Sequence, residues 1–252
     1  MSDANRYSAP AAELYEPRVE GEYGSVENGI AGNYELRIGE VLSSAWDAIK
    51  GRKSTVLGAS GLAFVVVLVY IAISGTIQFM FASEEGPGVG ASLITLPIDF
   101  IYYAITAAMT AGFYVMGAKI SIGLPVNMTD VFRYIGKLGK AFLTYLLMMF
   151  MVLVGLLLLV LPGIYLIVGY SFAVTLALEK GMSPWQALET SRKTVHHQWF
   201  KLFGLMLLIG VLGMLSVFTL GIALIWLVPL ICVAYGTIYR DMFGLEQETL
   251  AS

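Results

Sequence analysis

The chain has 252 residues, of which 58% are hydrophobic and 13% charged, and its mean hydropathy is +0.77. Because soluble domains carry about 25% charged residues, this composition excludes an ordinary soluble domain and favours a protein built into a membrane. The net charge of -3 predicts little about partners, and the single cysteine, Cys232, excludes a disulfide within the chain.

The N-terminal segment, residues 1–35, contains no long apolar run. Its first 33 residues are rich in Glu, Ala, Gly and Ser, and acidic residues outnumber basic ones. A segment of this composition cannot bury enough apolar surface to fold alone, so we expect a disordered, acidic cytoplasmic tail. No apolar core of a cleavable signal peptide precedes residue 54, and we expect the first membrane span to act as the targeting signal.

Six apolar runs follow, and their lengths suit membrane spans, which need about 20 residues. They lie at about 54–81, 92–118, 141–161, 163–178, 202–219 and 221–239. All 15 Lys and Arg residues fall before the first run, in every second connection, or after the last run. The other connections carry none: an acidic loop at 83–88 and two tight turns, at 161–163 and near 219–221. By the positive-inside rule, both termini lie in the cytoplasm. We predict an all-α, polytopic membrane helical bundle over residues 36–240 and a cytoplasmic C-terminal tail over 241–252.

Three segments on the basic side have the pattern of short amphipathic helices, at about 36–51, 128–139 and 184–199. Each leads into a pair of spans, so the sequence favours three repeats of an interfacial helix followed by a spanning hairpin. Convergence on a common physical pattern is the alternative. Helices of this kind lie in the headgroup region, and we expect them to contact anionic lipid. The candidate contact residues are Trp46, Arg133, Lys137, Lys140, Trp185, Arg192 and Trp199.

Arg192 is unusual because helical spacing places its guanidinium within the apolar stripe of the third segment. Three explanations are open. The side chain extends to water, it binds a lipid phosphate, or it pairs with a carboxylate such as Glu179 or Glu189. A structural ion pair is the favoured explanation.

Small residues recur every four positions on the second and fourth spans. Such ridges let helix backbones approach closely, and they are common at helix contacts in membranes. The predicted packing positions are Ala104, Ala108, Gly112, Gly169, Ala173 and Ala177.

The spans contain little that predicts catalysis. Asp99 is the one carboxylate inside a span, near its outer end. Gly58-Ala59-Ser60-Gly61 matches the serine motif of rhomboid intramembrane proteases, but the histidines His196 and His197 lie outside the spans. The chain has no phosphate-binding loop, no metal-ligand cluster and no nucleic-acid signature. We therefore predict a protein that is not an enzyme, uses no cofactor or metal, and binds no nucleic acid.

Five motifs carry a resemblance to a known family. They are Gly39-Glu40-Val41-Leu42-Ser43-Ser44-Ala45-Trp46, Leu161-Pro162-Gly163-Ile164-Tyr165, Glu179-Lys180-Gly181-Met182-Ser183, Ala187-Leu188-Glu189-Thr190-Ser191-Arg192 and Trp199-Phe200-Lys201-Leu202-Phe203-Gly204. The pattern resembles the YciC-like family of bacterial membrane proteins and the membrane domain fused to some glycerophosphodiester phosphodiesterases. The resemblance covers about residues 36–240. It implies a six-helix bundle of the bacterial inner membrane, with no substrate or catalytic residues, and the phosphodiesterase domain itself is absent.

Two functions remain open. The first is a non-catalytic module that interacts with lipids or partner membrane proteins, including further copies of itself, at the cytoplasmic interface. The second is a permease for a small apolar or amphipathic solute, with a path between the second and fourth spans. A cavity containing Thr106, Thr110, Ser171 and Thr175 would favour the permease, and a solid interface there would favour the module.

Overall fold

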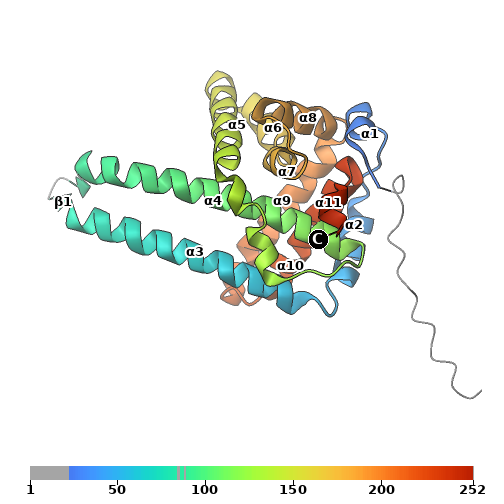
Figure 1. Ribbon diagram of the computed structural model, residues 1–252, viewed down its shortest axis with the longest axis horizontal. Helices are drawn as coiled ribbons and strands as arrows, with labels where there is room; N and C mark the ends of the chain where they lie inside the picture. The colour runs from blue at the N-terminus through green and yellow to red at the C-terminus, as the bar shows by residue number, and fades with distance from the viewer. Residues whose placement is uncertain (1–22, 84–85, 88, 252) are drawn as a thin grey trace, which may run out of the picture.

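The computed structural model describes residues 23–83, 86–87 and 89–251, and within them the chain is almost entirely helical (Figure 1). Two short helices, α1 (Val26–Ala31) and α2 (Ile38–Ala48), precede a hairpin of α3 (Lys53–Met80) and α4 (Val89–Ser121), whose tip carries the paired strands β1 (Ala82–Ser83) and β2 (Gly86–Pro87). Two 3-10 helices, η1 (Met128–Phe132) and η2 (Ile135–Lys137), lead to α5 (Leu138–Leu158), α6 (Val160–Gly169) and α7 (Ala173–Glu179). The remaining elements are α8 (Pro184–His196), α9 (Trp199–Ser216), η3 (Val217–Thr219), α10 (Leu224–Phe243) and α11 (Gln247–Ala251).

Six helical stretches in the described part of the chain are long and apolar enough to cross a membrane. They are Lys53–Met80, Gly90–Ser121, Met128–Leu158, Val160–Glu179, Trp199–Thr219 and Leu224–Phe243. The predicted all-α class with six membrane-spanning helices is therefore confirmed.

The core is built from the second span of each hairpin. In the most apolar part of these spans, 28%, 50% and 56% of the residues are buried inside the protein, in chain order. The corresponding shares for the first spans are only 11%, 22% and 17%. The helices α4, α7 and α10 therefore form the centre, and α3, α5 and α9 lie around it.

The helices α4 and α10 approach closely because each has glycine at the contact. A Cβ atom added at Gly117 would collide with the backbone of Cys232, and one at Gly236 with the backbone of Gly117 and Ala118. The two helices run in the same direction: Cys232 Sγ donates to the Phe113 carbonyl (3.1 Å), and further along both helices Arg240 donates to Ser121 (2.8 Å). Glycine thus brings two backbones together in the way expected of membrane bundles.

Each of the three predicted interfacial segments packs against the second span of one hairpin. The 3-10 helix η1 packs on α4, and α8 packs on α7, so each segment contacts the second span of the preceding hairpin. The helix α2 has no preceding hairpin, and it packs instead on α10, the second span of the last one. This cyclic arrangement is what three repeats of one unit would produce.

An aromatic cluster fills the space between α4, α7 and α10. The ring of Phe172, at the start of α7, lies 5.7 Å from that of Tyr114 on α4, 6.0 Å from Tyr239 and 5.8 Å from Phe243 on α10. Tyr114 also stacks on Tyr235, with ring centroids 5.1 Å apart. The centre of the bundle is therefore packed with side chains.

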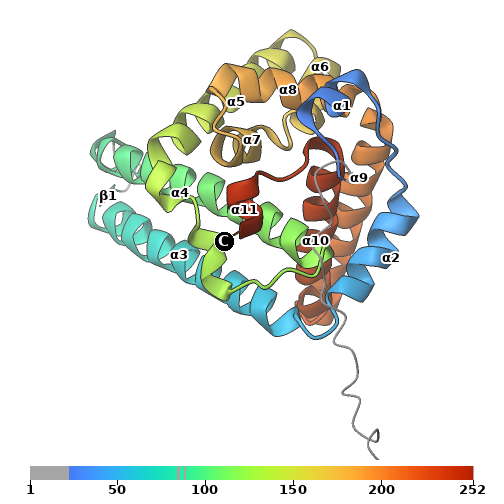
Figure 2. The same cartoon turned by 45° about the vertical axis from the view of Figure 1, so that its right-hand side comes forward.

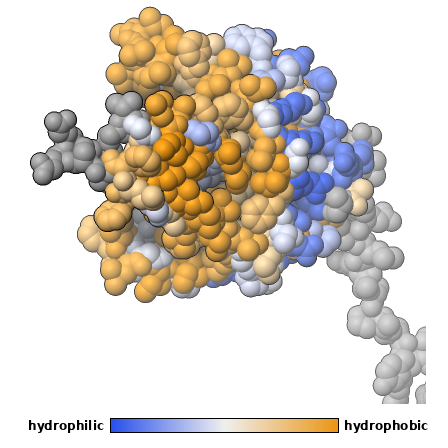
Figure 3. Space-filling model, turned by 60° about the vertical axis from the view of Figure 1, so that its left-hand side comes forward, coloured by the Kyte–Doolittle hydropathy of each residue, from blue (hydrophilic) through white to orange (hydrophobic). Residues whose placement is uncertain are grey.

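Polar and apolar surfaces are separated along the molecule. The α3–α4 hairpin extends away from the other helices in both ribbon views (Figures 1 and 2). Hydrophobic residues cover most of the face drawn in Figure 3, and hydrophilic residues gather at its right-hand side. We call the end that carries α1, α2, α8, α11 and residues 122–137 the polar end.

Both predicted tails contain ordered segments. The range 1–35 was predicted to be disordered, but residues 26–31 form α1, which Ser25 caps and which packs on α8 and α10. Residues 1–22 lie outside the described part of the chain. The predicted C-terminal tail, 241–252, includes the end of α10 and the short helix α11. Both corrections arise because these segments bury side chains against the bundle rather than folding alone.

The predicted interfacial helix over 128–139 is not a continuous α-helix. The capping box of Asn127 and Asp130 starts a 3-10 helix, which ends before Tyr134, and Gly136 and Gly139 then weaken any α-helix in this segment. The structure therefore enters α5 through two short turns.

The fourth span also differs from the prediction. The turn expected at 161–163 lies earlier, at the extended residue Leu159, and Pro162 sits in the first turn of α6, where it costs no hydrogen bond. The span is then interrupted between α6 and α7. Ser191 of α8 stabilises this break, because its hydroxyl donates to the Gly169 carbonyl (2.7 Å) and accepts from the Phe172 amide (3.3 Å).

Candidate functional site

A buried carboxylate organises the polar end. The side chain of Glu179, the last residue of α7, is fully buried. One carboxylate oxygen accepts a hydrogen bond from the Tyr239 hydroxyl (2.9 Å), and the other accepts from the backbone amide of Glu246 (2.7 Å). Lys180 Nζ lies 3.5 Å from the same carboxylate. Since a buried charge is tolerated only when it is paired and hydrogen-bonded, Glu179 fastens α7, α10 and the C-terminal segment to one another.

The C-terminal segment, residues 244–251, is held over this carboxylate by charged residues. Lys180 Nζ lies 3.1 Å from Glu246 Oε1, and Arg133 donates to the Glu248 carbonyl (3.5 Å). The segment leaves α10 at Gly244, whose φ of 69° favours glycine. The chain therefore turns back onto the bundle immediately after the last span.

A pocket of about 330 Å³ lies between this segment and the bundle. Its walls carry three basic and three acidic side chains. The lining residues are Arg133, Tyr134, Lys137, Glu179, Lys180, Gly181, Glu246, Gln247, Glu248 and Thr249. This is a polar pocket at the polar end of the molecule, and two of the predicted contact residues, Arg133 and Lys137, line it.

Lys137 and Lys140, predicted as lipid contacts, both bind the end of α7. Lys137 Nζ donates to the Leu178 carbonyl (2.9 Å), and Lys140 Nζ donates to the Gly181 carbonyl (2.6 Å). Helix C-termini carry carbonyls without helical partners and a partial negative charge, which cations stabilise. These two lysines therefore join the second interfacial segment and the start of α5 to the end of α7 and the turn that follows it.

Arg192 pairs with Glu189 and not with Glu179. The guanidinium donates two hydrogen bonds to the Glu189 carboxylate, at 3.1 and 2.8 Å, and Lys193 Nζ lies 3.4 Å from the same group. The hydrogen bond from Arg192 lowers the pKa of Glu189, and the carboxylate raises the pKa of Arg192 in turn. The cluster contains two cations and one carboxylate, so it keeps a net positive charge.

The three tryptophans that were predicted as lipid contacts differ in their exposure. Trp46 on α2 and Trp185 on α8 are 45% and 56% exposed. Trp199 is partly buried, where its indole donates to the Tyr165 carbonyl (3.1 Å) and its ring stacks on Phe203. The next residue, Phe200, is 82% exposed. Large apolar side chains thus stand on the surface within eight residues of Arg192 and Lys193 in the sequence, on either side of them.

The residues predicted to pack helices are all inside the bundle. Ala104, Ala108, Gly112, Gly169, Ala173 and Ala177 are buried. A Cβ atom at Gly112 would collide with the backbone of Val131 in η1, and one at Gly169 would meet the side chain of Arg192.

The polar residues proposed for a solute path do not line an open route. The hydroxyls of Thr106, Thr110 and Ser171 donate to carbonyls of their own helices, and Thr175 is buried. Between α4, α5 and α7 lies an apolar cluster of Ala107, Ala108, Ala111, Val115, Tyr134, Ala141 and Leu178. The contact between the second and fourth spans is therefore solid at this point.

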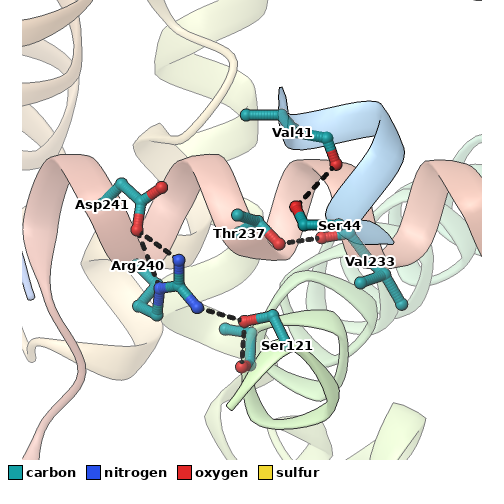
Figure 4. Close-up of polar contacts among 8 residues, drawn as sticks. Val41, Ser44, Ser121, Val233, Thr237, Arg240 and Asp241 are labelled. Carbon is teal, nitrogen blue, oxygen red and sulfur yellow. Dashed lines mark hydrogen bonds and ion pairs between the residues drawn. The ribbon is translucent and has the colours of Figure 1, made fainter. Parts of the chain in front are cut away.

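Sequence reasoning missed the residues that join distant helices. Figure 4 shows one such contact, in which Arg240 of α10 reaches across to Ser121 of α4 (2.8 Å) while it also pairs with Asp241. Tyr239, Lys180 and Glu246 were missed for the same reason. Their partners are far away in the sequence, and no local spacing pattern signals such a contact.

The site offers no arrangement for metal binding. In the stretches of chain that the structure covers, no three His, Cys, Asp or Glu side chains group closely enough to hold a metal ion. Asp99 on α4 accepts the Tyr70 hydroxyl of α3 (2.9 Å), which gives it an interhelical partner within the hairpin.

Six apolar helices with a separate polar end are the features of a multi-pass membrane protein. No family model matches the chain, and comparisons with curated proteins and with solved structures found no similar one. The resemblance to the YciC-like family stays a prediction.

Proposed function

We propose that this protein is a non-catalytic, multi-pass protein of the bacterial inner membrane whose polar end lies in the cytoplasm and interacts with anionic lipids or with partner membrane proteins. Both termini lie in the cytoplasm under this proposal, and the chain is a member of the YciC-like family. The basic connections of the sequence support this orientation.

The observation that carries the proposal is the surface around α8 and the start of α9. Exposed Trp185 and Phe200 lie within eight residues of Arg192 and Lys193 along α8 and the start of α9, and the two basic residues share the Glu189 carboxylate. Aromatic residues prefer the membrane–water interface, and basic residues beside them attract anionic headgroups. This combination fits a helix that lies at the membrane surface, and the packed centre of the bundle is consistent with a non-transporting role.

The permease remains a second candidate because of the interrupted fourth span. Broken helices in transporters expose backbone groups that bind the substrate or ion. Here the Gly169 carbonyl and the Phe172 amide are bonded to the Ser191 hydroxyl. The break therefore offers these groups to another helix rather than to a solute, which favours the lipid-interacting module.

The test is native mass spectrometry of the protein extracted from membranes that contain phosphatidylglycerol and phosphatidylcholine. Each basic residue near an anionic membrane surface contributes about 1 kcal/mol to the free energy of lipid binding. Arg192→Ala should therefore lower phosphatidylglycerol retention about fivefold. Glu189→Gln should raise it, because it leaves Arg192 and Lys193 without their shared carboxylate.

Lys50→Ala is a control for loss of a positive charge elsewhere. Lys50 lies at the end of α2 and pairs with Asp47 at 2.7 Å. Its replacement should change retention less than Arg192→Ala does. Equal retention in the wild type, Arg192→Ala and Glu189→Gln would overturn the proposal for this surface.

A further inference from the structure

The pocket beneath the C-terminal segment has basic residues on the bundle and acidic residues on the segment. The bundle contributes Arg133, Lys137 and Lys180, whereas Glu246 and Glu248 belong to the segment. The remaining carboxylate, Glu179, has both oxygens engaged by hydrogen bonds. With the segment docked, the pocket is balanced at three cations and three carboxylates. With the segment undocked, three cations face a single carboxylate.

The donors in this pocket are not fully used. Arg133 has five N–H donors, and in the pocket it donates a long hydrogen bond, of 3.5 Å, to the Glu248 carbonyl. The residue Tyr134 is 4% exposed, and its buried hydroxyl makes no hydrogen bond of good geometry within the part of the chain that the structure describes. A buried hydroxyl without a partner is costly. Both groups lie where an additional acceptor would find donors.

The C-terminal segment is short, and its place depends on contacts with the bundle. Its helix, α11, has five residues, far fewer than the roughly 12 that an isolated helix needs, so it depends on docking. Gly244 provides a joint with positive φ directly after α10. The ion pair that holds the segment involves Glu246, whose side chain is half exposed.

We propose that this pocket is a binding site for a phosphate group, which takes the place of Glu246 and Glu248 and releases the C-terminal segment. Arginine binds phosphate through paired hydrogen bonds, and lysine binds it as a point charge. Phosphate oxygens accept from Arg133, Lys137 and Lys180, and the released segment uncovers the Tyr134 hydroxyl as a fourth donor. The phosphate comes either from a lipid headgroup or from a soluble phosphate ester.

Hydrogen–deuterium exchange of the full-length protein in detergent tests this proposal. The amide of Glu246, now bonded to Glu179, reports whether the segment is docked. Titration with inorganic phosphate, at an ionic strength held constant with chloride, should speed exchange over residues 245–251 in a saturable manner. Vesicles of phosphatidic acid, compared with phosphatidylcholine, show whether a lipid headgroup has the same effect.

Two variants and one control separate this effect from general salt sensitivity. The double variant Glu246→Gln/Glu248→Gln removes the competing charges and should tighten phosphate binding roughly tenfold. Arg133→Gln should weaken it by a similar factor, and Lys50→Gln, on α2, should leave it unchanged. A response to phosphatidic acid alone would assign the site to a lipid.

Two results would overturn the inference. One is the absence of a saturable response to either phosphate source in both the wild type and the double variant. The other is an equal response in the wild type and in Arg133→Gln. The surface around Arg192 is not altered in these variants, so failure here is distinct from failure of the proposed function.

Discussion

The hydroxyl of Tyr239 donates to the carboxylate of Glu179 at 2.9 Å, and this contact joins α10 to the end of α7 in the interior of the protein. Both residues are buried, Tyr239 completely so. The pair explains how a charged residue is accommodated next to an aromatic cluster, because the carboxylate also accepts from the Glu246 amide and faces Lys180.

Replacing Tyr239 by Phe should destabilise the protein. The change removes one donor from a buried carboxylate and leaves the ring in place, so we expect a loss of about 1–3 kcal/mol. The measurement is thermal unfolding in detergent. Tyr103→Phe is the control, since that ring is 40% exposed on α4, and it should have little effect. Equal unfolding temperatures for the two variants would contradict this role of Glu179.

Gly236→Ala should disrupt the contact between α4 and α10. The added methyl group collides with the backbone of Gly117 and Ala118, which cannot move without separating the helices. Overpacking of this kind costs about 1–3 kcal/mol or more. Gly210→Ala on α9 is the matched control, because a Cβ atom there meets no neighbour within 4 Å. Alanine is the better helix former, so that variant should be as stable as the wild type or slightly more stable in the same unfolding assay.

Ser191→Ala should weaken the interrupted fourth span. The change leaves the Gly169 carbonyl and the Phe172 amide without their partner on α8. Hydrogen exchange at Phe172 should become faster, and stability should fall by about 1–3 kcal/mol. Ser44→Ala on α2 removes a hydroxyl that is bonded only to its own helix in the described contacts, and it should be nearly neutral. Unchanged exchange at Phe172 would show that Ser191 does not stabilise the break.

The pairing of Glu189 with Arg192 should give a pH dependence at acidic pH. The hydrogen bond lowers the pKa of Glu189 in the folded protein below its value in the unfolded chain. The stabilising contribution is therefore present at neutral pH, and it is lost as the pH falls through the lowered pKa. NMR titration of the Glu189 carboxyl in the wild type and in Arg192→Ala measures this lowering of the pKa. The pKa should rise in the variant, and an unchanged pKa would contradict the observed pairing.

Hydropathy and charge predicted the architecture because both are local properties of the sequence. The lengths of the apolar runs and the alternation of basic connections were enough to predict six spans. The four-residue spacing identified small residues that the structure places inside the bundle, such as Ala108 and Ala173. The capping box of Ser183 and Gln186 at the start of α8 is a local feature of the same kind. Each of these features depends on residues close together in the chain.

The details that sequence reasoning missed depend on distant residues. The fourth span breaks where Ser191, on another helix, supplies hydrogen bonds, and no pattern within the span signals this. Lys137 and Lys140 have the spacing of a basic surface, yet each binds a carbonyl at the end of α7. Glu179 directly follows the fourth apolar run, and its partners Tyr239 and Glu246 lie more than 50 residues away in the sequence.

The orientation of the polar end underlies the proposed function, and single-cysteine labelling measures it directly. In a Cys232→Ala background, Lys50→Cys places a thiol at the polar end, and Ile222→Cys places one in the turn before α10, at a residue that is 58% exposed. A membrane-impermeant maleimide applied to intact spheroplasts should label Ile222→Cys, and it should label Lys50→Cys only after the membrane is opened. Labelling of Lys50→Cys in intact spheroplasts would contradict a cytoplasmic polar end, and with it the proposed interaction with lipids or partner proteins on the cytoplasmic side.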